Sequence, residues 1–241
     1  MDWQDRTRLL LGQEKVDVFQ QSHVLVAGLG GVGGMLAEML CRAGVGTLTL
    51  VDGDTVHLTN LNRQIPALHS TLGKPKVEVV AQRLKDINPE INLHLAPVFL
   101  RDEIMQEYLS RPYDYVADAI DTLSPKMHLI RISLEKGHRL VSAMGAGGKT
   151  DPMQIRVSDI SNSYNCRLAY SIRKRLHRQG IFTGFKVVFS PEPVSGKAVR
   201  MISGEQNKLT TVGTISYMPA VFGSHMAAVI LMDMINQQGT I

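Results

Sequence analysis

A glycine-rich turn between an apolar strand and a helix constrains the fold of this chain more than any other sequence feature. Residues 24–27 are all apolar, as in a strand that is buried on both faces of a parallel sheet. Gly28, Gly30 and Gly33 follow at the Gly-x-Gly-x-x-Gly spacing. This spacing permits a tight turn, brings backbone amides close to phosphates and lets the next helix pack on its strand. The pattern therefore predicts a phosphate-binding strand, turn and helix.

The next strand places a carboxylate where a ribose would lie. A helix is predicted from about residue 32 to 43 and ended by Gly44, and a second strand at 47–51 runs into Asp52. An acid at that strand end is placed for a ribose hydroxyl. Because the same arrangement is typical of NAD and FAD sites, an NAD-binding protein is one interpretation.

Three charged residues farther along the chain favour a triphosphate over a dinucleotide. Arg63 and Lys76 are cations suited to stabilising the charge on a departing pyrophosphate. Asp121 offers a hard oxygen for Mg²⁺, which commonly combines one or two carboxylates with substrate phosphates. ATP with Mg²⁺ is therefore favoured over NAD.

The rest of the chain alternates between helical and strand patterns. Further helices are predicted at 76–84, at 126–136 with Pro125 in the first turn, and at 218–235. Further strands are predicted at 92–98 and 113–117, with a short helix between them, and at 140–143 and 185–189, before a loop at 190–204. Asp52, Asp121 and a glycine loop at 145–148 should meet at the carboxyl ends of the strands.

We therefore expect an α/β fold, Rossmann-like and doubly wound, with a mostly parallel sheet. Residues 1–160 would form the nucleotide-binding core. Residues 161–241 would form an irregular basic C-terminal extension with a basic helix, a mobile loop and a final packing helix. A chain of 241 residues with 44% hydrophobic content can bury a substantial core, so one domain over 1–241 suffices.

Several motifs resemble, in order and spacing, those of the adenylating superfamily of ubiquitin-activating enzymes, ThiF and MoeB: Gly28-x-Gly30-Gly31-x-Gly33, Asp52-x-Asp54, Asn60-Leu-Asn-Arg63-Gln64, Lys76 and Asp118-x-x-Asp121. The resemblance implies a single ThiF-type adenylating domain with Mg²⁺ on Asp121. The residues that it assigns to ATP are the four glycines Gly28, Gly30, Gly31 and Gly33, then Asp52 for the ribose, Gln64, and Asn60, Arg63 and Lys76 for the phosphates.

The resemblance also implies a homodimer. Members of the superfamily have an arginine near the N-terminus that crosses the dimer and reaches the ATP of the neighbouring subunit. Arg6 stands at this position, and Arg8 is close enough to be an alternative. The expected catalytic residues are therefore Arg6, Arg63, Lys76 and Asp121.

Longer segments are similar to the tRNA threonylcarbamoyladenosine dehydratases, namely NLNRQIPAL at 60–68, DAIDTLSPK at 118–126 and GAGGKTDPMQI at 145–155. That family uses ATP to activate the threonyl carboxylate on a modified adenosine beside the anticodon, and then closes it into a ring. The implied activity is ATP-dependent dehydration of this nucleoside in tRNA through an acyl adenylate. Whether a monovalent cation orders the loop at 145–148 stays open.

Two alternative functions remain. The chain could adenylate the C-terminus of a ubiquitin-like sulfur carrier, as ThiF and MoeB do, with partners from a sulfur-transfer pathway. The segment GAGGKTDPMQI and the lack of paired zinc cysteines argue against this reading. The chain could also be an NAD-binding protein or a catalytically silent binding module, which the intact Arg63, Lys76 and Asp121 disfavour.

A basic segment in the C-terminal third is a candidate tRNA surface. Apolar residues at 168, 172 and 176 recur every four positions and predict one stripe of a helix. The cations around this stripe are Arg167, Arg173, Lys174, Arg175 and Arg178. They either lie on a solvated surface or contact tRNA phosphates, and the net charge of +4 permits both.

The two cysteines provide information on metal binding and on the cellular compartment. No Cys-x-x-Cys pair is present, so the structural zinc of some superfamily members is not expected. Cys41 is interpreted as a packing residue, and Cys166 either as a packing or surface thiol or as a nucleophile beside the basic cluster. The first ten residues lack a secretory pattern, and no apolar run approaches the length needed to cross a bilayer, so a cytoplasmic protein without a membrane segment is expected.

Three polar residues beside the motifs have structural interpretations. Asp54 is expected to support its turn, and Asp118 to brace the loop that presents Asp121. Asn62 is either a turn former or a phosphate contact.

Overall fold

The computed structural model describes residues 2–201 and 210–236 and has the predicted α/β architecture. A seven-stranded sheet runs in the order β3-β2-β1-β4-β5-β7-β6, and all neighbours are parallel except β6, which is antiparallel to β7. The strands are β1 (His23–Ala27), β2 (Thr47–Val51), β3 (Asn92–Ala96), β4 (Tyr115–Asp118), β5 (Leu140–Ala143), β6 (Arg156–Asp159) and β7 (Lys186–Phe189). A separate antiparallel pair joins β8 (Val199–Met201) to β9 (Thr210–Val212).

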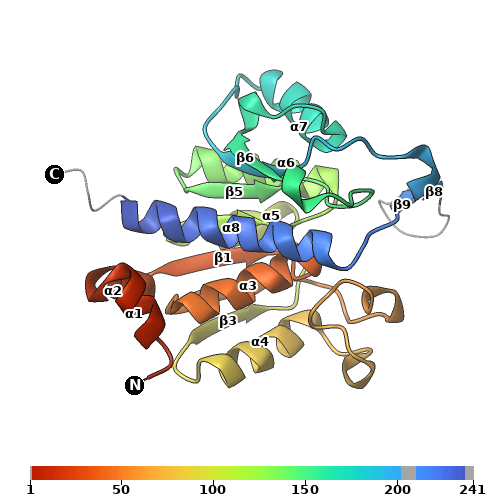
Figure 1. The fold of residues 1–241 in the computed structure, drawn as a ribbon. Coiled ribbons are helices and arrows are strands. Elements are labelled where there is room, and N and C mark those ends of the chain that lie inside the picture. The colour runs from red at the N-terminus through yellow and green to blue at the C-terminus, as the bar shows by residue number, and fades with distance from the viewer. Residues whose placement is uncertain (1, 202–209, 237–241) are drawn as a thin grey trace.

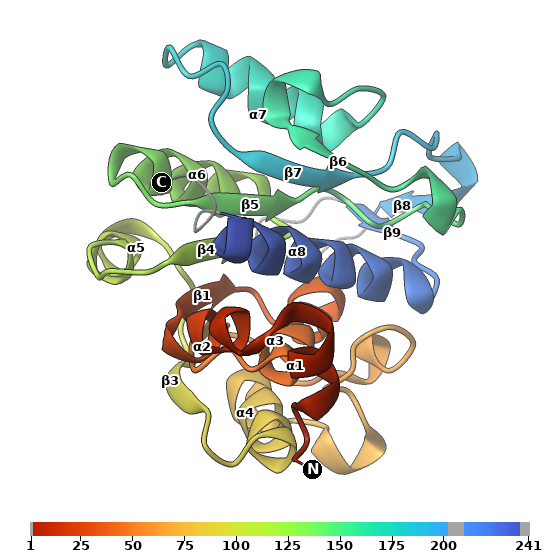
Figure 2. The same ribbon diagram turned by 60° about the vertical axis from the view of Figure 1, so that its left-hand side comes forward.

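Helices cover both faces of the sheet, as Figures 1 and 2 show. One core contains residues of α2 (Gln13–Gln21), α3 (Gly31–Ala43), α4 (Lys76–Ile87) and α8 (Tyr217–Asn236), and the other contains residues of α5 (Asp102–Leu109), α6 (Leu123–Glu135) and α7 (Arg167–His177). Strand β1 explains why two cores form. Val24 and Val26 point into the first core and Leu25 and Ala27 into the second, and all four are fully buried. The sheet is therefore doubly wound.

The strand order places a ligand crevice beside β1. Successive strands β2 and β3 extend the sheet on one side of β1, whereas β4, β5 and β7 extend it on the other. Open α/β sheets bind ligands at such a reversal, outside the carboxyl ends of the strands. Gly28 follows β1 and Ala119 follows β4, so these two residues stand at this reversal of the strand order.

Most predicted elements are confirmed, with shifted ends. Helix α6 begins at Leu123, which puts Pro125 in its first turn as predicted. The loop prediction is wrong at 199–201, because these residues form β8 and pair with β9, a partner too distant in sequence for local patterning to reveal. Residues 202–204 of the predicted loop lie outside the described residues. Strand β6 and the N-terminal helices α1 (Asp5–Leu11) and α2 were not predicted.

Helix α8 contradicts the expectation that no apolar segment is long enough to cross a bilayer. Its 20 residues are long and apolar enough to cross a membrane by length and composition alone. Met218, Phe222 and Met226 are fully buried in the core that also contains residues of α3 and β5. An apolar helix covered in this way is typical of the interior of a globular domain.

Candidate functional site

The glycine turn has no room for side chains. Gly28 has φ +89°, and a Cβ there would lie 2.9 Å from the carbonyl oxygen of Ala119. A Cβ on Gly33 would lie 1.7 Å from the carbonyl oxygen of Gly28, and one on Gly31 would lie 2.8 Å from Cβ of Pro219. The turn therefore packs directly on the loop after β4 and on α8, and the predicted close approach of α3 to its strand is confirmed.

Asp52 connects the glycine turn to the loop after β2. Its Oδ2 accepts a hydrogen bond from the backbone N–H of Leu29 at 2.6 Å, and its Oδ1 accepts one from the N–H of Asp54 at 2.8 Å. Burial raises the pKa of Asp52, and the nearby Lys76 opposes this rise. Each carboxylate oxygen has a further lone pair, so the group can still accept hydrogen bonds from ribose hydroxyls.

The segment after β2 brings an amide side chain over the glycine turn. Gln64 Nε2 lies 3.6 Å from the position of a Cβ on Gly30. No described residue donates a hydrogen bond to Gln64 Oε1, although this atom is buried. Because buried polar atoms are nearly always paired in native proteins, an unpaired one beside a phosphate-type turn fits a site that is completed by a ligand.

Two further polar residues of this segment are fixed by short contacts. Asn60 is buried, and its Oδ1 accepts a hydrogen bond from the N–H of His57 at 3.0 Å. Arg63 Nη1 donates to the carbonyl of Thr59 and to Oδ1 of Asn62, each at 2.8 Å. The guanidinium has five N–H donors, so this anchoring leaves donors for a phosphate.

Asn62 has a role that the sequence left open. Its Nδ2 donates to the carbonyl oxygen of Thr214 at 2.9 Å. Asn62 therefore ties the segment that contains Arg63 to the chain that leads into α8. This contact joins residues 152 positions apart, which no local motif could indicate.

Lys76 is buried at the start of α4 with only 4% of its surface exposed. Its Nζ lies 2.9 Å from Oδ2 of Asp54, and its backbone N–H donates to the carbonyl of Asp54 at 3.0 Å. The Asp54 side chain thus holds the ammonium of Lys76 in place, a contact that the predicted support of its own turn did not include. The ammonium has three donors, and those not used by Asp54 can bind a phosphate oxygen.

The loop that presents Asp121 rests on a buried ion pair. Asp118 and Lys126 are both fully buried, with Lys126 Nζ 2.6 Å from Asp118 Oδ2. Ser142 Oγ donates to the same Oδ2 at 2.6 Å, and Lys126 Nζ donates to Ser142 Oγ at 3.1 Å. Asp118 Oδ1 accepts from the N–H of Ile120 at 3.1 Å. The predicted brace is confirmed, but its partners Lys126 and Ser142 were missed by sequence reasoning.

Asp121 itself is exposed, immediately before α6. Within the described residues, no group of three or more His, Cys, Asp or Glu side chains could hold a metal ion. A single carboxylate still fits Mg²⁺ if substrate phosphates and water supply the other ligands.

Arg6 lies far from this site in its own chain. Gln4, beside it, lies against Gly44 at the end of α3 and bonds to Gln20 in α2, so α1 stands at the amino ends of the strands. Figure 1 shows α1 on the opposite side of the molecule from β8 and β9. Arg8 pairs with Asp2 and Asp5, whereas Arg6 is exposed and forms no ion pair with a described residue.

The basic segment is helix α7, and its cations differ in exposure. Ile172 and Leu176 are buried as the periodicity predicts. Arg173 is half-buried, and its Nη1 donates to the carbonyl of Ser163 at 2.6 Å, so this cation belongs to the structure of the loop before α7. The cations of α7 and its C-cap that remain exposed are Arg167, Lys174, Arg175 and Arg178.

Both cysteines are buried. Burial raises the pKa of the Cys41 thiol to about 11, in agreement with a packing role. Cys166 is 7% exposed and precedes the first residue of α7. A buried thiol is a poor nucleophile, so the packing interpretation is favoured for both residues.

The fold and the site define an α/β nucleotide-binding protein in which two cations and one exposed carboxylate surround a glycine turn. The chain belongs to the ThiF family, whose model matches residues 4–240. It is 37% identical over 237 residues to "tRNA threonylcarbamoyladenosine dehydratase" of Bacillus subtilis (strain 168), covering 95% of this chain and 93% of that protein.

Solved structures agree with this family. The structure is similar to that of the E. coli tRNA N6-threonylcarbamoyladenosine dehydratase, TcdA, with a TM-score of 0.88, 34% identity, and coverage of 99% of this chain and 96% of that one. The same E. coli protein in complex with ATP matches with a TM-score of 0.87 and 34% identity, covering 97% of this chain and 94% of that one.

The buried brace under Asp121 gives a stability prediction. Lys126→Met leaves the buried Asp118 carboxylate without its cation, which we expect to cost about 3–5 kcal/mol of unfolding free energy in urea denaturation. Arg131→Met is the matched control on the same helix, because its partner Glu135 is 51% exposed and such pairs contribute about 0–1 kcal/mol. Equal losses of unfolding free energy in the two variants would contradict the proposed role of the Asp118–Lys126 pair in holding this loop.

Proposed function

We propose that this protein is an ATP-dependent dehydratase of threonylcarbamoyladenosine in tRNA. One observation supports this most directly. The similarity to dehydratases of this name extends over nearly the whole length of both chains. The contacts of the glycine turn with Asp52 and with the loop after β4 are consistent with this proposal. A cytoplasmic location follows from the same proposal.

The adenylation step uses residues that are already held in place. A carboxylate oxygen of the threonyl group attacks the α-phosphorus of ATP, and the bond to pyrophosphate breaks. Asp52 binds the ribose, while Asn60, Gln64 and backbone amides of the glycine turn hold the triphosphate. Arg63 and Lys76 offset the charge that develops on pyrophosphate. Asp121 is the residue that would hold Mg²⁺, which supplies further neutralisation of phosphate charge when bound.

Ring closure needs no protein nucleophile. The acyl adenylate has AMP as its leaving group, so an atom of the neighbouring carbamoyl group can attack the acyl carbon. That atom loses its proton, and AMP departs with the former carboxylate oxygen. The nucleoside therefore loses the elements of one water, and the buried Cys41 and Cys166 take no part.

The dehydratase proposal predicts a defined mass change. Threonylcarbamoyl-modified tRNA incubated with this protein, ATP and Mg²⁺ should yield, by nucleoside mass spectrometry under mild conditions, a modified adenosine lighter by one water. Asp121→Ala should abolish the change, because it removes the expected Mg²⁺ ligand. Asp86→Ala, an exposed acid on α4, is the control and should leave it intact. Turnover of ATP without a mass change would point instead to a sulfur carrier as acceptor.

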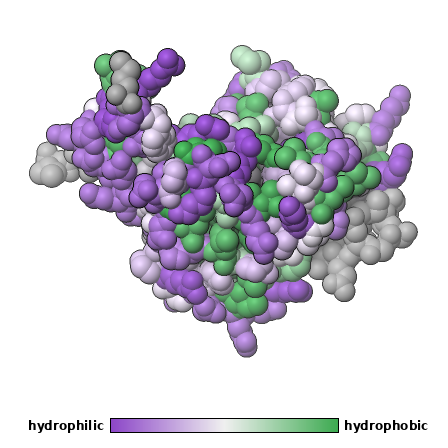
Figure 3. All heavy atoms as spheres, turned by 90° about the horizontal axis from the view of Figure 1, so that it is seen from below, coloured by the Kyte–Doolittle hydropathy of each residue, from purple (hydrophilic) through white to green (hydrophobic). Residues whose placement is uncertain are grey.

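We further propose a homodimer in which Arg6 reaches the ATP of the partner subunit. Arg6 stands at the amino ends of the strands of its own chain, so it cannot serve its own site at their carboxyl ends. Apolar side chains are exposed beside Arg6 on α1, Leu9 (90%) and Leu10 (81%), and also on the segment after β2 at the other ends of the strands, Leu58 (62%). Apolar patches also lie among polar ones on the face in Figure 3. Such patches mark protein interfaces.

The trans role of Arg6 predicts complementation between two inactive variants. In a mixed dimer of Arg6→Ala and Lys76→Met subunits, one site combines an intact Lys76 with an intact Arg6 from the neighbour. Random subunit exchange should therefore restore about a quarter of the sites, measured by pyrophosphate release. Arg8→Ala should be active alone, because Arg8 pairs with Asp2 and Asp5 of its own chain. Absence of recovery in dimers shown to be mixed would contradict the trans role.

Helix α7 is the proposed tRNA surface. Arg167, Lys174 and Arg178 recur at intervals of seven and four residues and so lie on one exposed stripe, with Tyr170, 59% exposed, between the first two. Cations of this kind bind phosphates, and an exposed tyrosine ring offers a stacking surface for an unpaired base.

Neutralising this stripe should weaken tRNA binding in a salt-dependent way. The triple variant Arg167→Ala, Lys174→Ala, Arg178→Ala should raise KM for tRNA and reduce the slope of log affinity against log salt by about three. Lys15→Ala, Arg101→Ala, Lys136→Ala removes three exposed cations elsewhere and is the matched control. An unchanged slope of log affinity against log salt in the α7 variant would mean that these cations do not contact tRNA phosphates.

A further inference from the structure

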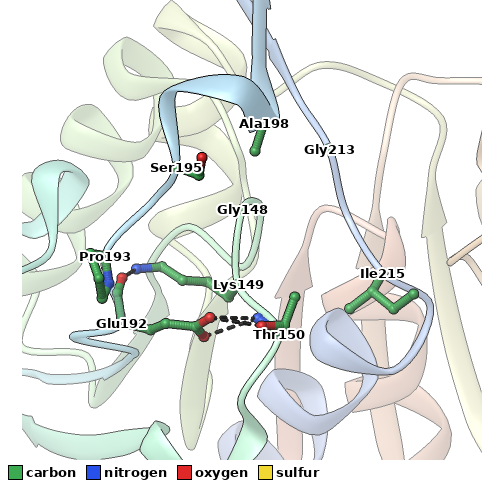
Figure 4. A pocket seen from close by; sticks show the side chains of 9 residues that line it. All are labelled: Gly148, Lys149, Thr150, Glu192, Pro193, Ser195, Ala198, Gly213 and Ile215. Carbon is green, nitrogen blue, oxygen red and sulfur yellow. Dashed lines mark hydrogen bonds between the residues drawn. The ribbon is translucent and has the colours of Figure 1, made fainter.

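A pocket lies near the glycine turn, at the carboxyl ends of β5 and β7. Its volume is about 340 Å³, and Figure 4 shows it between the glycine loop after β5, the segment after β7 and the chain that leads into α8. The residues that line it include Lys149, Glu192, Pro193, Ala198, Gly213 and Ile215. The sequence predicted that the glycine loop 145–148 lies near the ligand but gave no indication of a separate pocket.

Hydrogen bonds fix the walls of this pocket to one another. Lys149 is buried, and its Nζ donates to the carbonyl oxygens of Ser190, at 3.1 Å, and Glu192. The Glu192 carboxylate accepts from the backbone N–H groups of Thr150 and Asp151 at 2.9 and 3.0 Å. Gly148 N–H donates to the carbonyl of Gly213 at 2.7 Å, which joins the third wall. The pocket is therefore preformed by three connected segments.

One wall of the pocket also borders the nucleotide crevice. The carbonyl of Thr214, next to Ile215, accepts the hydrogen bond from Asn62, which is adjacent to Arg63. Pro219, four residues beyond Ile215, packs on Gly31 of the glycine turn. The segment 213–219 therefore contacts both the pocket and the glycine turn.

The sheet order places this pocket on the other side of the phosphates from the ATP ribose. Asp52, the ribose ligand, follows β2, whereas the pocket lies at the ends of β5 and β7. Strands β1 and β4, whose exits carry the glycine turn and the loop of Asp121, stand between them. ATP bound through Asp52 therefore places its adenosine away from the pocket and its phosphates between the two sites.

The lining suits the flat ring of a nucleobase. Pro193, Ala198 and Ile215 provide apolar contact, and Lys149 has one N–H beyond the two that bind carbonyls. The volume falls in the range of small-molecule sites, about 300–1,000 Å³. The Glu192 carboxylate keeps its negative charge while it accepts its backbone hydrogen bonds, and the ammonium of Lys149 nearby offsets part of that charge for an anionic substrate.

We infer that this pocket receives the base of the modified adenosine, turned out of the tRNA loop, with its threonyl carboxylate directed across residues 213–217 toward the α-phosphate of ATP. The inference rests on the proposed dehydratase function and adds the location of the acceptor nucleoside. Enzymes that act on a base commonly extract it from its stack in this way. Helix α7 lies in the same half of the molecule as β7, so a tRNA bound there could reach the pocket (Figure 2).

Filling the pocket with an indole ring tests this assignment. Ile215 is 43% exposed, so Ile215→Trp should fold, as retained ATP binding in calorimetry would verify. We expect kcat/KM for modified tRNA to fall about a hundredfold, because a displaced carboxylate loses its alignment with ATP. Gln82→Trp is the control, since Gln82 lines a pocket of about 320 Å³ between α4 and β3, at the other edge of the sheet, and its kcat/KM should be unchanged.

Binding of the free nucleoside gives a readout that does not depend on turnover. Threonylcarbamoyladenosine should bind the wild-type protein in equilibrium dialysis without displacing ATP, and Ile215→Trp should abolish this binding. Competition with ATP, or wild-type kcat/KM in Ile215→Trp, would overturn the pocket assignment while leaving the dehydratase function intact. A wild-type protein that binds ATP and leaves modified tRNA unchanged would overturn the function itself.

Discussion

The direct contact between the glycine turn and the loop after β4 is the constraint on which the rest of the site depends. A Cβ on Gly28 would lie 2.9 Å from the carbonyl of Ala119, so only a bare backbone lets the exits of β1 and β4 meet. Asp52 then fastens the turn to the exit of β2 through the N–H of Leu29. The segments that follow β1, β2 and β4 are thereby held together, and their charged side chains lie at the same edge of the sheet.

Two buried lysines hold charge at this edge of the sheet in different ways. Lys126 is enclosed with Asp118 and Ser142, so its ammonium contacts only these groups and fixes the loop of Asp121. Lys76 is also buried, but its partner Asp54 is 48% exposed, and part of its ammonium can therefore turn to a ligand. A buried ion pair is costly to desolvate, so the first pair is better explained by positioning than by net stabilisation.

The sequence was sufficient where chemistry follows from adjacent residues. The glycine spacing, the apolar run that ends at Asp52 and the amphipathic pattern of α7 are local, and each predicted its element correctly. The contacts of the turn with phosphate and of Asp52 with ribose stay predictions. The sequence was insufficient where contacts join distant segments, as for Lys126 with Ser142, Asn62 with Thr214 and Gly148 with Gly213. Arg173 is a further example. The sequence grouped it with the other cations of α7, but its hydrogen bond to the carbonyl of Ser163 gives it a structural role.

The proposed placement of the ATP phosphates between the ribose site and the acceptor pocket would let one chain couple adenylation to ring closure. With the ATP ribose held at β2 and the acceptor base at β5 and β7, the two reacting groups approach from opposite sides of the glycine turn. In-line displacement requires the attacking carboxylate and the departing pyrophosphate to lie on opposite sides of the α-phosphorus. Lys76, the proposed pyrophosphate ligand, pairs with Asp54 on the β2 side of the glycine turn, away from the pocket at β5 and β7. Once AMP is attached, the carbamoyl group is already beside the acyl carbon. Proximity then replaces the nucleophilic thiol that the buried cysteines do not supply.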